Sequence, residues 1–93
     1  MGNYRIIVKK TAKRDLAKHK KSGNLKSRAR ISKIIEELKH HPYSGIGKPE
    51  KLKYNLAGFW SRRINKKDRL VYEVVETVVT VYIVSAMGHY DDK

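Results

Sequence analysis

The hydrophobic pattern at the start of the chain predicts a short strand followed by a helix. Residues 4–8 (YRIIV) are aromatic and β-branched and end at two lysines, which is typical of a strand. A helix is expected from Ala12 to Ser22, with Thr11 as its N-cap and Gly23 as its stop. We expect this helix on the surface, because its apolar face is thin and consists of Ala12, Leu16 and Ala17.

A second and stronger helical pattern follows at once. We predict a helix from Leu25 to His40, capped by Asn24 and ended by Pro42. His40 and His41 then fall near the negative end of the helix dipole, and we prefer this explanation to a catalytic one. The apolar residues that recur at helical spacing are Leu25, Ala29, Ile31, Ile34, Ile35 and Leu38.

The second half of the chain alternates between a loop and strand-like runs. His41 to Asn55 is rich in Pro and Gly and is predicted to be a loop. Strands are expected at Phe59 to Ile64, Arg69 to Val75 and Val78 to Ser85, separated by short turns that favour an antiparallel meander. The order is βααβββ(β), which predicts an α+β fold with the two N-terminal helices packed on one face of an antiparallel sheet.

The composition points to a basic protein with a polyanionic partner. We expect residues 1–93 to form one domain. Lys and Arg outnumber Asp and Glu by 22 to 9, a net charge of +13, which steers a small protein toward polyanions. Nucleic acid is the first candidate, an anionic membrane the second and an acidic protein the third; a generally basic, soluble surface is the plain alternative.

The chain also lacks several features. It contains no cysteine, so it forms no disulfide and no thiolate metal site. No apolar stretch reaches the length of a signal peptide core or of a membrane span. We therefore expect a cytoplasmic protein that does not bind a membrane.

Residues in the second half could supply the chemistry of RNA cleavage. This reaction needs a base for the 2′-hydroxyl, a cation for the phosphorane and an acid for the leaving 5′-oxygen. Glu50 is a candidate base in the loop, and His89 beside Tyr90 is a candidate acid. Each has a plain alternative, since Glu50 is also explained as a solvated acid among lysines and His89 as a tail histidine.

Three arginines are candidates for binding a phosphate. Arg62 and Arg63 are neighbours on a predicted strand, so their side chains point to opposite faces. Trp60 and Ile64 resemble a core pair on the face of Arg62, which leaves Arg63 on the open face. Arg69 begins the next strand and should lie within one or two residues' reach of Arg63 or Ile64 across the hairpin. Two guanidiniums that converge on one spot would share an anion, for which a phosphate is the obvious candidate.

Taken in order, these residues resemble a known family. The segments HPYSGIGKPEKLKYNLAGFWSRRI (41–64), RLVY (69–72) and His89-Tyr90 are similar to the Txe/YoeB toxins of the RelE/ParE superfamily, and the resemblance covers residues 4–90. It implies two helices on a curved antiparallel sheet. It also implies the toxin of a type II toxin–antitoxin system, a ribosome-dependent endoribonuclease (mRNA interferase) that cuts mRNA in the A site and stops translation. The family uses no metal or other cofactor, its antitoxins are of the YefM/Axe type, and its members often form homodimers.

The resemblance assigns roles to matching positions. Glu50 corresponds to the general base, Arg69 to the arginine that stabilises the transition state, His89 to the general acid and Tyr90 to the residue that orients the substrate. The remaining expected RNA or phosphate contacts are Arg63, Arg62, Lys48 and Lys53.

The chain departs from the family pattern at its end. Gly88 stands where an aromatic residue is usual, and Asp91-Asp92-Lys93 follow Tyr90. Two other functions stay open: a basic nucleic-acid-binding module without catalysis, and a gyrase-poisoning toxin of the ParE type.

Overall fold

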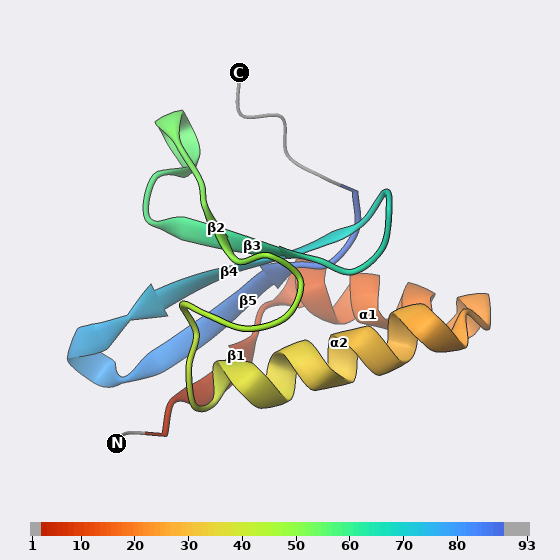
Figure 1. Cartoon of the computed structure of the whole chain (residues 1–93), viewed down its shortest axis with the longest axis horizontal. Helices are drawn as coiled ribbons and strands as arrows, with labels where there is room; N and C mark the ends of the chain where they lie inside the picture. Colours follow the sequence, from red (N-terminus) through yellow and green to blue (C-terminus); the bar gives the residue numbers. More distant parts are fainter. Residues whose placement is uncertain (1–2, 89–93) are drawn as a thin grey trace.

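The computed structural model describes residues 3–88, and in this part of the chain five strands form one sheet in the spatial order β1-β5-β4-β3-β2 (Figure 1). The strands β2 to β5 are antiparallel neighbours, whereas β1 is parallel to β5. The expectation of a purely antiparallel sheet was therefore wrong, because the first strand, β1, pairs with the last strand, β5, and runs parallel to it. The strands are β1 (Arg5–Val8), β2 (Glu50–Lys51), β3 (Phe59–Arg63), β4 (Arg69–Val75) and β5 (Thr80–Ser85).

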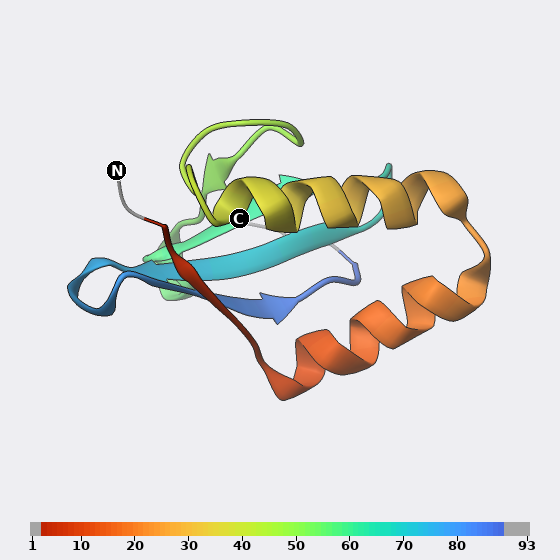
Figure 2. The same ribbon diagram turned by 90° about the horizontal axis from the view of Figure 1, so that it is seen from below.

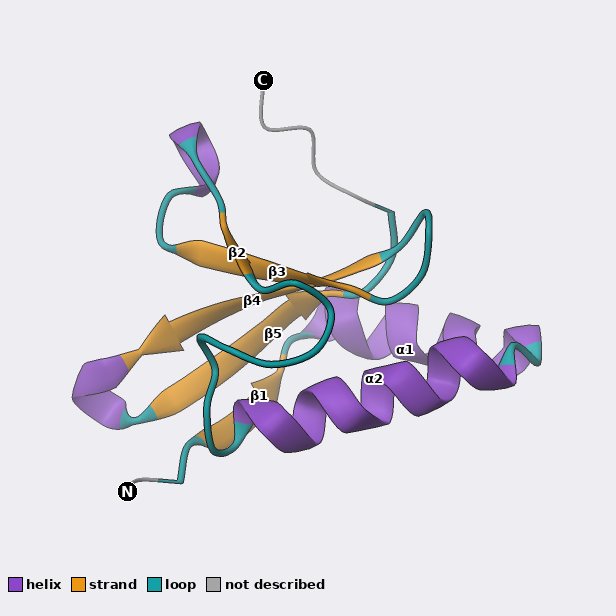
Figure 3. Ribbon diagram, in the orientation of Figure 1, coloured by secondary structure: helices purple, strands orange, loops and turns teal. Residues whose placement is uncertain are grey.

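Two helices lie on the same side of this sheet, as expected (Figures 2 and 3). The first, α1, covers Lys10–Ser22 and ends at Gly23, whose φ of 78° is the left-handed conformation of a helix stop. The second, α2, covers Leu25–Leu38, and Asn24 Oδ1 accepts a hydrogen bond from the Ser27 amide at 3.0 Å.

The helix boundaries differ from the prediction in two places. Thr11 lies inside α1 and is not its cap, since the helix begins at Lys10 with Lys9 in the capping position. The second helix stops at Leu38, so His40 and His41 lie beyond it. Both errors are of one or two residues at helix ends, where the chain leaves helical geometry gradually.

The core lies between the helices and the sheet. α2 contributes Ile31, Ile34 and Leu38, while α1 contributes Ala12 and the half-buried Leu16. Leu25, Ala29 and Ala17, which were expected to be apolar helix positions, are exposed. The sheet residues of the core are Ile64, Leu70, Tyr72, Val81 and Ile83.

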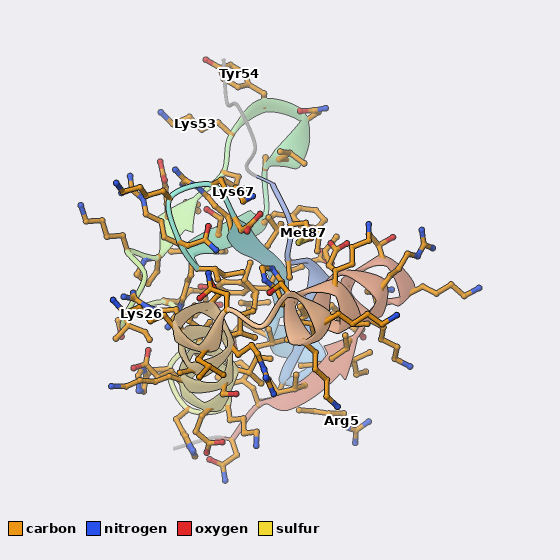
Figure 4. All side chains as sticks on the ribbon, turned by 90° about the vertical axis from the view of Figure 1, so that its right-hand side faces the viewer. Arg5, Lys26, Lys53, Tyr54, Lys67 and Met87 are labelled. Atoms are coloured by element: carbon orange, nitrogen blue, oxygen red, sulfur yellow. The ribbon has the colours of Figure 1, made fainter. Side chains whose placement is uncertain are left out.

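The long segment after α2 is more structured than a loop. It contains the short strand β2 and a 3₁₀ helix, Tyr54–Leu56, at the outer end of the β2–β3 connection. Figure 4 shows Lys53 and Tyr54 at this tip, far from Lys26 on α2. A second 3₁₀ helix, Glu76–Val78, replaces the start of the last predicted strand.

The helices of residues 3–88 are too short or too polar to span a lipid bilayer.

Candidate functional site

The sheet register brings Glu50 and Arg69 together. Arg63 on β3 lies directly opposite Arg69 on β4, and Glu50 on β2 lies opposite Ser61 on β3. The Glu50 carboxylate is bonded to the Arg69 guanidinium, with Oε1 3.3 Å from Nη1. The predicted base and the predicted phosphate-binding arginine are thus neighbours in space, although 18 residues separate them in the chain.

This site occupies the sheet face that the helices leave uncovered. Trp60 on β3, Ile64 just after it, and Leu70 and Tyr72 on β4 point toward the helices. Their alternating neighbours point the other way, and residues paired across strands share a face. Glu50, Arg63 and Arg69 therefore lie on one open face, as the alternation around Arg63 predicted.

Exposure and charge suit this face to an anionic ligand. The Glu50 side chain is 60% exposed and that of Arg69 is 25% exposed, so both can reach a ligand in solvent. Arg63 is also exposed. Two guanidiniums side by side attract a phosphodiester, and the carboxylate beside them is an acceptor for a proton. Within residues 3–88 no group of three or more His, Asp or Glu side chains is placed to hold a metal ion.

Arg62, which was expected to contact RNA, is turned into the protein. Its side chain is 0% exposed and donates hydrogen bonds to Glu37 Oε1 at 2.7 Å and to Tyr72 Oη at 3.2 Å. It also donates to the carbonyl oxygens of His41, Ser44 and Ile46. All its donors are occupied inside the molecule, so Arg62 is not a phosphate-binding residue here. It fixes the loop that leads to β2.

The partner of Arg62 carries a shifted pKa. Burial alone raises the pKa of Glu37, but the hydrogen bond from the Ile46 amide and the bond and charge of Arg62 lower it more strongly. The net pKa of Glu37 lies below its ordinary value. The Glu37 carboxylate therefore stays charged. It accepts hydrogen bonds from the Ile46 amide in the loop and from Arg62, which itself binds the loop carbonyls.

The two lysines expected near RNA lie at different distances from the site. Lys48 is exposed, has a left-handed φ of 51° and stands two residues before Glu50. The preceding Gly47 is bonded through its carbonyl oxygen to the Arg63 amide at 2.7 Å, which keeps Lys48 beside the site. Lys53 lies beside Tyr54 at the outer tip of the β2–β3 connection (Figure 4).

A buried hydroxyl lies beneath the site. Ser61 is 1% exposed and faces Glu50 across the β2–β3 pair. Among the described residues its Oγ is the buried side-chain polar atom that has no hydrogen-bond partner. Such an atom is uncommon in a folded protein. The serine in FWSRR gave no separate signal in the sequence.

The end of β5 brings the chain to Arg69. The Arg69 amide donates a hydrogen bond of 2.7 Å to the carbonyl oxygen of Gly88, the last described residue. His89 and Tyr90, predicted as acid and substrate-orienting residue, lie outside the described residues. Gly88, the residue before His89, is nevertheless bound to the backbone of Arg69.

Two buried polar residues of α1 were missed by the sequence analysis. Asp15 is 9% exposed and His19 is 5% exposed, and both bond to Ala86 just after β5. The signal was present, because positions 12, 15, 16 and 19 fall on one helix face. Polar residues on the face that carries Ala12 and Leu16 could have been recognised as buried.

Comparison with known proteins identifies the class of protein to which this fold and site belong. A family model described as "YoeB-like toxin of bacterial type II toxin-antitoxin system" matches residues 9–90. The chain belongs to this family of YoeB toxins, as its resemblance to Txe/YoeB sequences predicted.

Individual relatives agree with this assignment. Toxin YoeB of Synechocystis is 48% identical over 61 residues, which are 66% of this chain and 69% of the relative. The structure of the YoeB dimer from Staphylococcus aureus has a TM-score of 0.79 at 36% identity, and covers 96% of this chain and 100% of that one. The YoeB–YefM complex from the same organism has a TM-score of 0.76 at 37% identity with the same coverage. The α+β, RelE-like fold is thereby confirmed.

Proposed function

We propose that this toxin is an endoribonuclease that cuts mRNA in the A site of the ribosome by acid–base catalysis. The observation that carries the proposal is the Glu50–Arg69 pair on the open sheet face, with Arg63 directly opposite Arg69. A carboxylate and two guanidiniums are the base and the charge-stabilising groups that cleavage at a 2′-hydroxyl needs.

In this mechanism Glu50 accepts the proton of the 2′-hydroxyl. The 2′-oxygen then forms a bond to the adjacent phosphorus, while the bond from phosphorus to the 5′-oxygen breaks. Arg69 and Arg63 stabilise the charge that builds up on the phosphoryl oxygens. The Arg69–Glu50 bond suits this order of steps, because an entering phosphate competes for the guanidinium and frees the carboxylate to act as a base.

The leaving 5′-oxygen needs a proton, and we assign its donation to His89, with Tyr90 beside it to orient the substrate. Imidazole donates a proton readily near neutral pH. The bond between the Arg69 amide and the Gly88 carbonyl supports this assignment, since it anchors the residue before His89 at the arginine. The reaction is balanced, with one proton taken from the 2′-hydroxyl and one given to the 5′-oxygen.

Two protein partners are part of the proposal. Relatives from Staphylococcus aureus have been solved as a YoeB dimer and as a complex with YefM. We propose a YefM/Axe-like antitoxin and a homodimer for this chain as well. A net charge of +13 favours an acidic antitoxin segment, and it equally favours ribosomal RNA. Both partners and the ribosome imply a cytoplasmic site of action.

Cleavage on programmed ribosomes tests the proposal. Purified toxin is mixed with 70S ribosomes that carry a defined message, and in parallel with the same message free in solution. We expect a cut in the A-site codon only on the ribosome. Equal cutting of free RNA, or no cutting, would contradict the proposal; binding without cutting would indicate a basic nucleic-acid-binding module, and inhibition of gyrase a ParE-like toxin.

Variants of the site make the test specific. Arg69→Ala should slow cleavage by about 10²–10³-fold, the usual cost of removing one group that stabilises developing charge. Glu50→Gln should slow cleavage while ribosome binding persists. Glu36→Gln, a change of an exposed acid on α2 paired with Lys39, is the matched control and should cleave normally.

A further inference from the structure

The chain between β5 and the end of the described part is held at four backbone atoms. The Ala86 amide donates to Asp15 Oδ2 at 2.9 Å, and His19 Nε2 lies 2.7 Å from the Ala86 carbonyl oxygen. On the other side, the Gly88 amide donates to Asp68 Oδ1 at 2.9 Å, and its carbonyl oxygen accepts from the Arg69 amide at 2.7 Å. Every polar backbone atom of Ala86 and Gly88 thus has a partner outside a sheet ladder.

The side chains that hold this segment are buried, and their burial costs desolvation free energy. Asp15, His19 and Asp68 are 9%, 5% and 5% exposed. Burial of polar groups is unfavourable unless they are hydrogen-bonded, and the bonds to residues 86–88 offset this cost. Because a carbonyl oxygen only accepts, His19 must carry its hydrogen on Nε2. Asp15 and His19 stand one helical turn apart on α1, and they bind the amide and the carbonyl oxygen of Ala86.

The Asp68 contact is itself braced from α2. Asn65 Nδ2 donates to Asp68 Oδ2 at 3.1 Å and to Ser27 Oγ at 2.8 Å. Ser27 lies in the first turn of α2, so both helices contribute to the position of residues 86–88. Ser85 ends the last strand, and beyond it these side chains replace the hydrogen bonds of a neighbouring strand.

We infer that Asp15 and His19 are positioning residues for the proposed general acid. Their bonds fix Ala86, Asp68 and the Arg69 amide fix Gly88, and the next residue in the chain is His89. The inference rests on the proposed function, in which His89 protonates the leaving oxygen. A histidine that followed a segment with a free backbone would sample many positions, whereas here the residue before it is bound to the Arg69 amide.

Cleavage rates on programmed 70S ribosomes test the inference. His19→Leu should reduce the cleavage rate of bound ribosomes by about 10–100-fold, as expected for a displaced catalytic group, with ribosome affinity unchanged. His19→Gln keeps a donor of similar reach and should recover most of the rate. Asp15→Ala and Asp15→Asn form a second pair with the same expectation. His40→Leu, which removes an exposed histidine bonded to Asn3, is the control and should cleave normally.

A double-mutant cycle separates positioning from general stability. If His19 acts through His89, His19→Leu should cost little in a His89→Ala background. Equal losses in both backgrounds would overturn the inference, and so would an unchanged rate in His19→Leu. Hydrogen exchange gives a readout without catalysis, because the Ala86 and Gly88 amides should be protected in the parent and the Ala86 amide exposed in Asp15→Ala.

Two outcomes keep the inference and the proposed function apart. If the parent toxin does not cleave, the proposed function fails, while amide exchange still reports whether α1 fixes the segment. If His19→Leu does not fold, His19→Asn, which is too short to reach the Ala86 carbonyl, takes its place. A parent that cleaves, a His89→Ala variant that cleaves far more slowly, and a His19→Asn variant that cleaves at the parent rate would overturn the positioning role alone.

Discussion

At the scale of single residues, Arg62 and Arg63 show how two neighbours of the same type acquire opposite roles. Alternation along β3 sends Arg63 to the open face and Arg62 toward the helices. There Arg62 meets Glu37, the hydroxyl of Tyr72 and three loop carbonyls. One arginine is left for a ligand because the other is fully used by the protein.

Removal of the buried guanidinium should destabilise the fold. Arg62→Met keeps much of the volume but leaves Glu37 without its charged partner, and we expect a decrease of about 3–5 kcal/mol in the free energy of unfolding. Arg63→Met, at the adjacent exposed position, should change stability by less than about 0.5 kcal/mol. Urea denaturation followed by circular dichroism measures both, and similar values for the two variants would contradict the burial of Arg62.

The lowered pKa of Glu37 predicts a dependence of stability on pH. A carboxyl whose pKa is lower in the folded state than in the unfolded state stabilises the fold above its ordinary pKa of 4.5, and this contribution disappears as the pH falls through the folded value. The difference in the free energy of unfolding between the parent and Glu37→Gln should therefore become smaller as the pH falls below 4.5. A gap that stays constant down to pH 2 in urea titrations would contradict the shift.

At the scale of elements, the loop between α2 and β2 is fixed by interactions that only glycine permits. Gly45 has a φ of 130°, and a Cβ atom there would lie 2.0 Å from Glu37 Oε1 and 2.9 Å from Arg62 Nη1. The loop can fold over the Glu37–Arg62 pair only because this position has no side chain.

A matched pair of glycine variants tests this packing. Gly58 also has a positive φ, of 96°, but a Cβ there would meet nothing within 4 Å. Gly58→Ala should cost the backbone strain alone, about 1–3 kcal/mol. Gly45→Ala should cost roughly 2 kcal/mol more, because it also displaces a charged hydrogen bond. Thermal unfolding of both variants measures the loss of stability. An equal loss in the two variants would mean that Glu37 and Arg62 shift aside at no cost.

Local signals predicted most of the fold. Helical spacing located α2, an αL glycine located the end of α1, and β-branched runs located β4 residue for residue. Periodicity does not reveal strand partners far apart in the chain, so the parallel pairing of β1 with β5 was missed. The strand β2 has only two residues, too short for any alternation, and it is recognisable only by its pairing with β3.

The site was predictable to the same extent. The alternation around Trp60 and Ile64 predicted the exposure of Arg63, and the hairpin predicted its proximity to Arg69. The burial of Arg62 depended on Glu37, a residue of α2 that carried no sequence signal of its own. Buried polar contacts between distant segments, including those of Asp15 and His19, are decided by tertiary packing.

At the scale of the whole molecule, the positive charge is organised around α2 as well as spread over the surface. Two adjoining hollows share Arg30; one is lined by Lys26 and Lys33 and the other by Arg63 and Lys66. We call these five cations the basic groove. Among residues 3–88 no acidic side chain lines either hollow, and the groove runs from α2 to an arginine of the candidate site.

Neutralisation of the groove should weaken ribosome binding in a salt-dependent way. Lys26→Gln with Lys33→Gln should lower affinity and reduce the slope of log affinity against log salt by about 0.7 for each phosphate that is no longer neutralised. Lys10→Gln with Lys13→Gln, on α1, is the control of equal charge and should leave the slope nearly unchanged. Equal effects of the two pairs would indicate attraction by net charge alone. Filter binding over a range of salt concentrations measures the slope.

The pairing of β1 with β5 sets the moment at which the molecule becomes complete. During synthesis β1 emerges first, yet Arg5 lies opposite Thr80 and the strand has no place in the sheet until β5 leaves the exit tunnel. Residues 86–88, which are bound to α1 through Ala86, emerge later still. Under the proposed function, a nascent chain that still lacks β5 and residues 86–88 has an incomplete site and cannot cut mRNA on the ribosome that is making it. Catalysis becomes possible only once these residues have left the exit tunnel, and an antitoxin must be available from that moment.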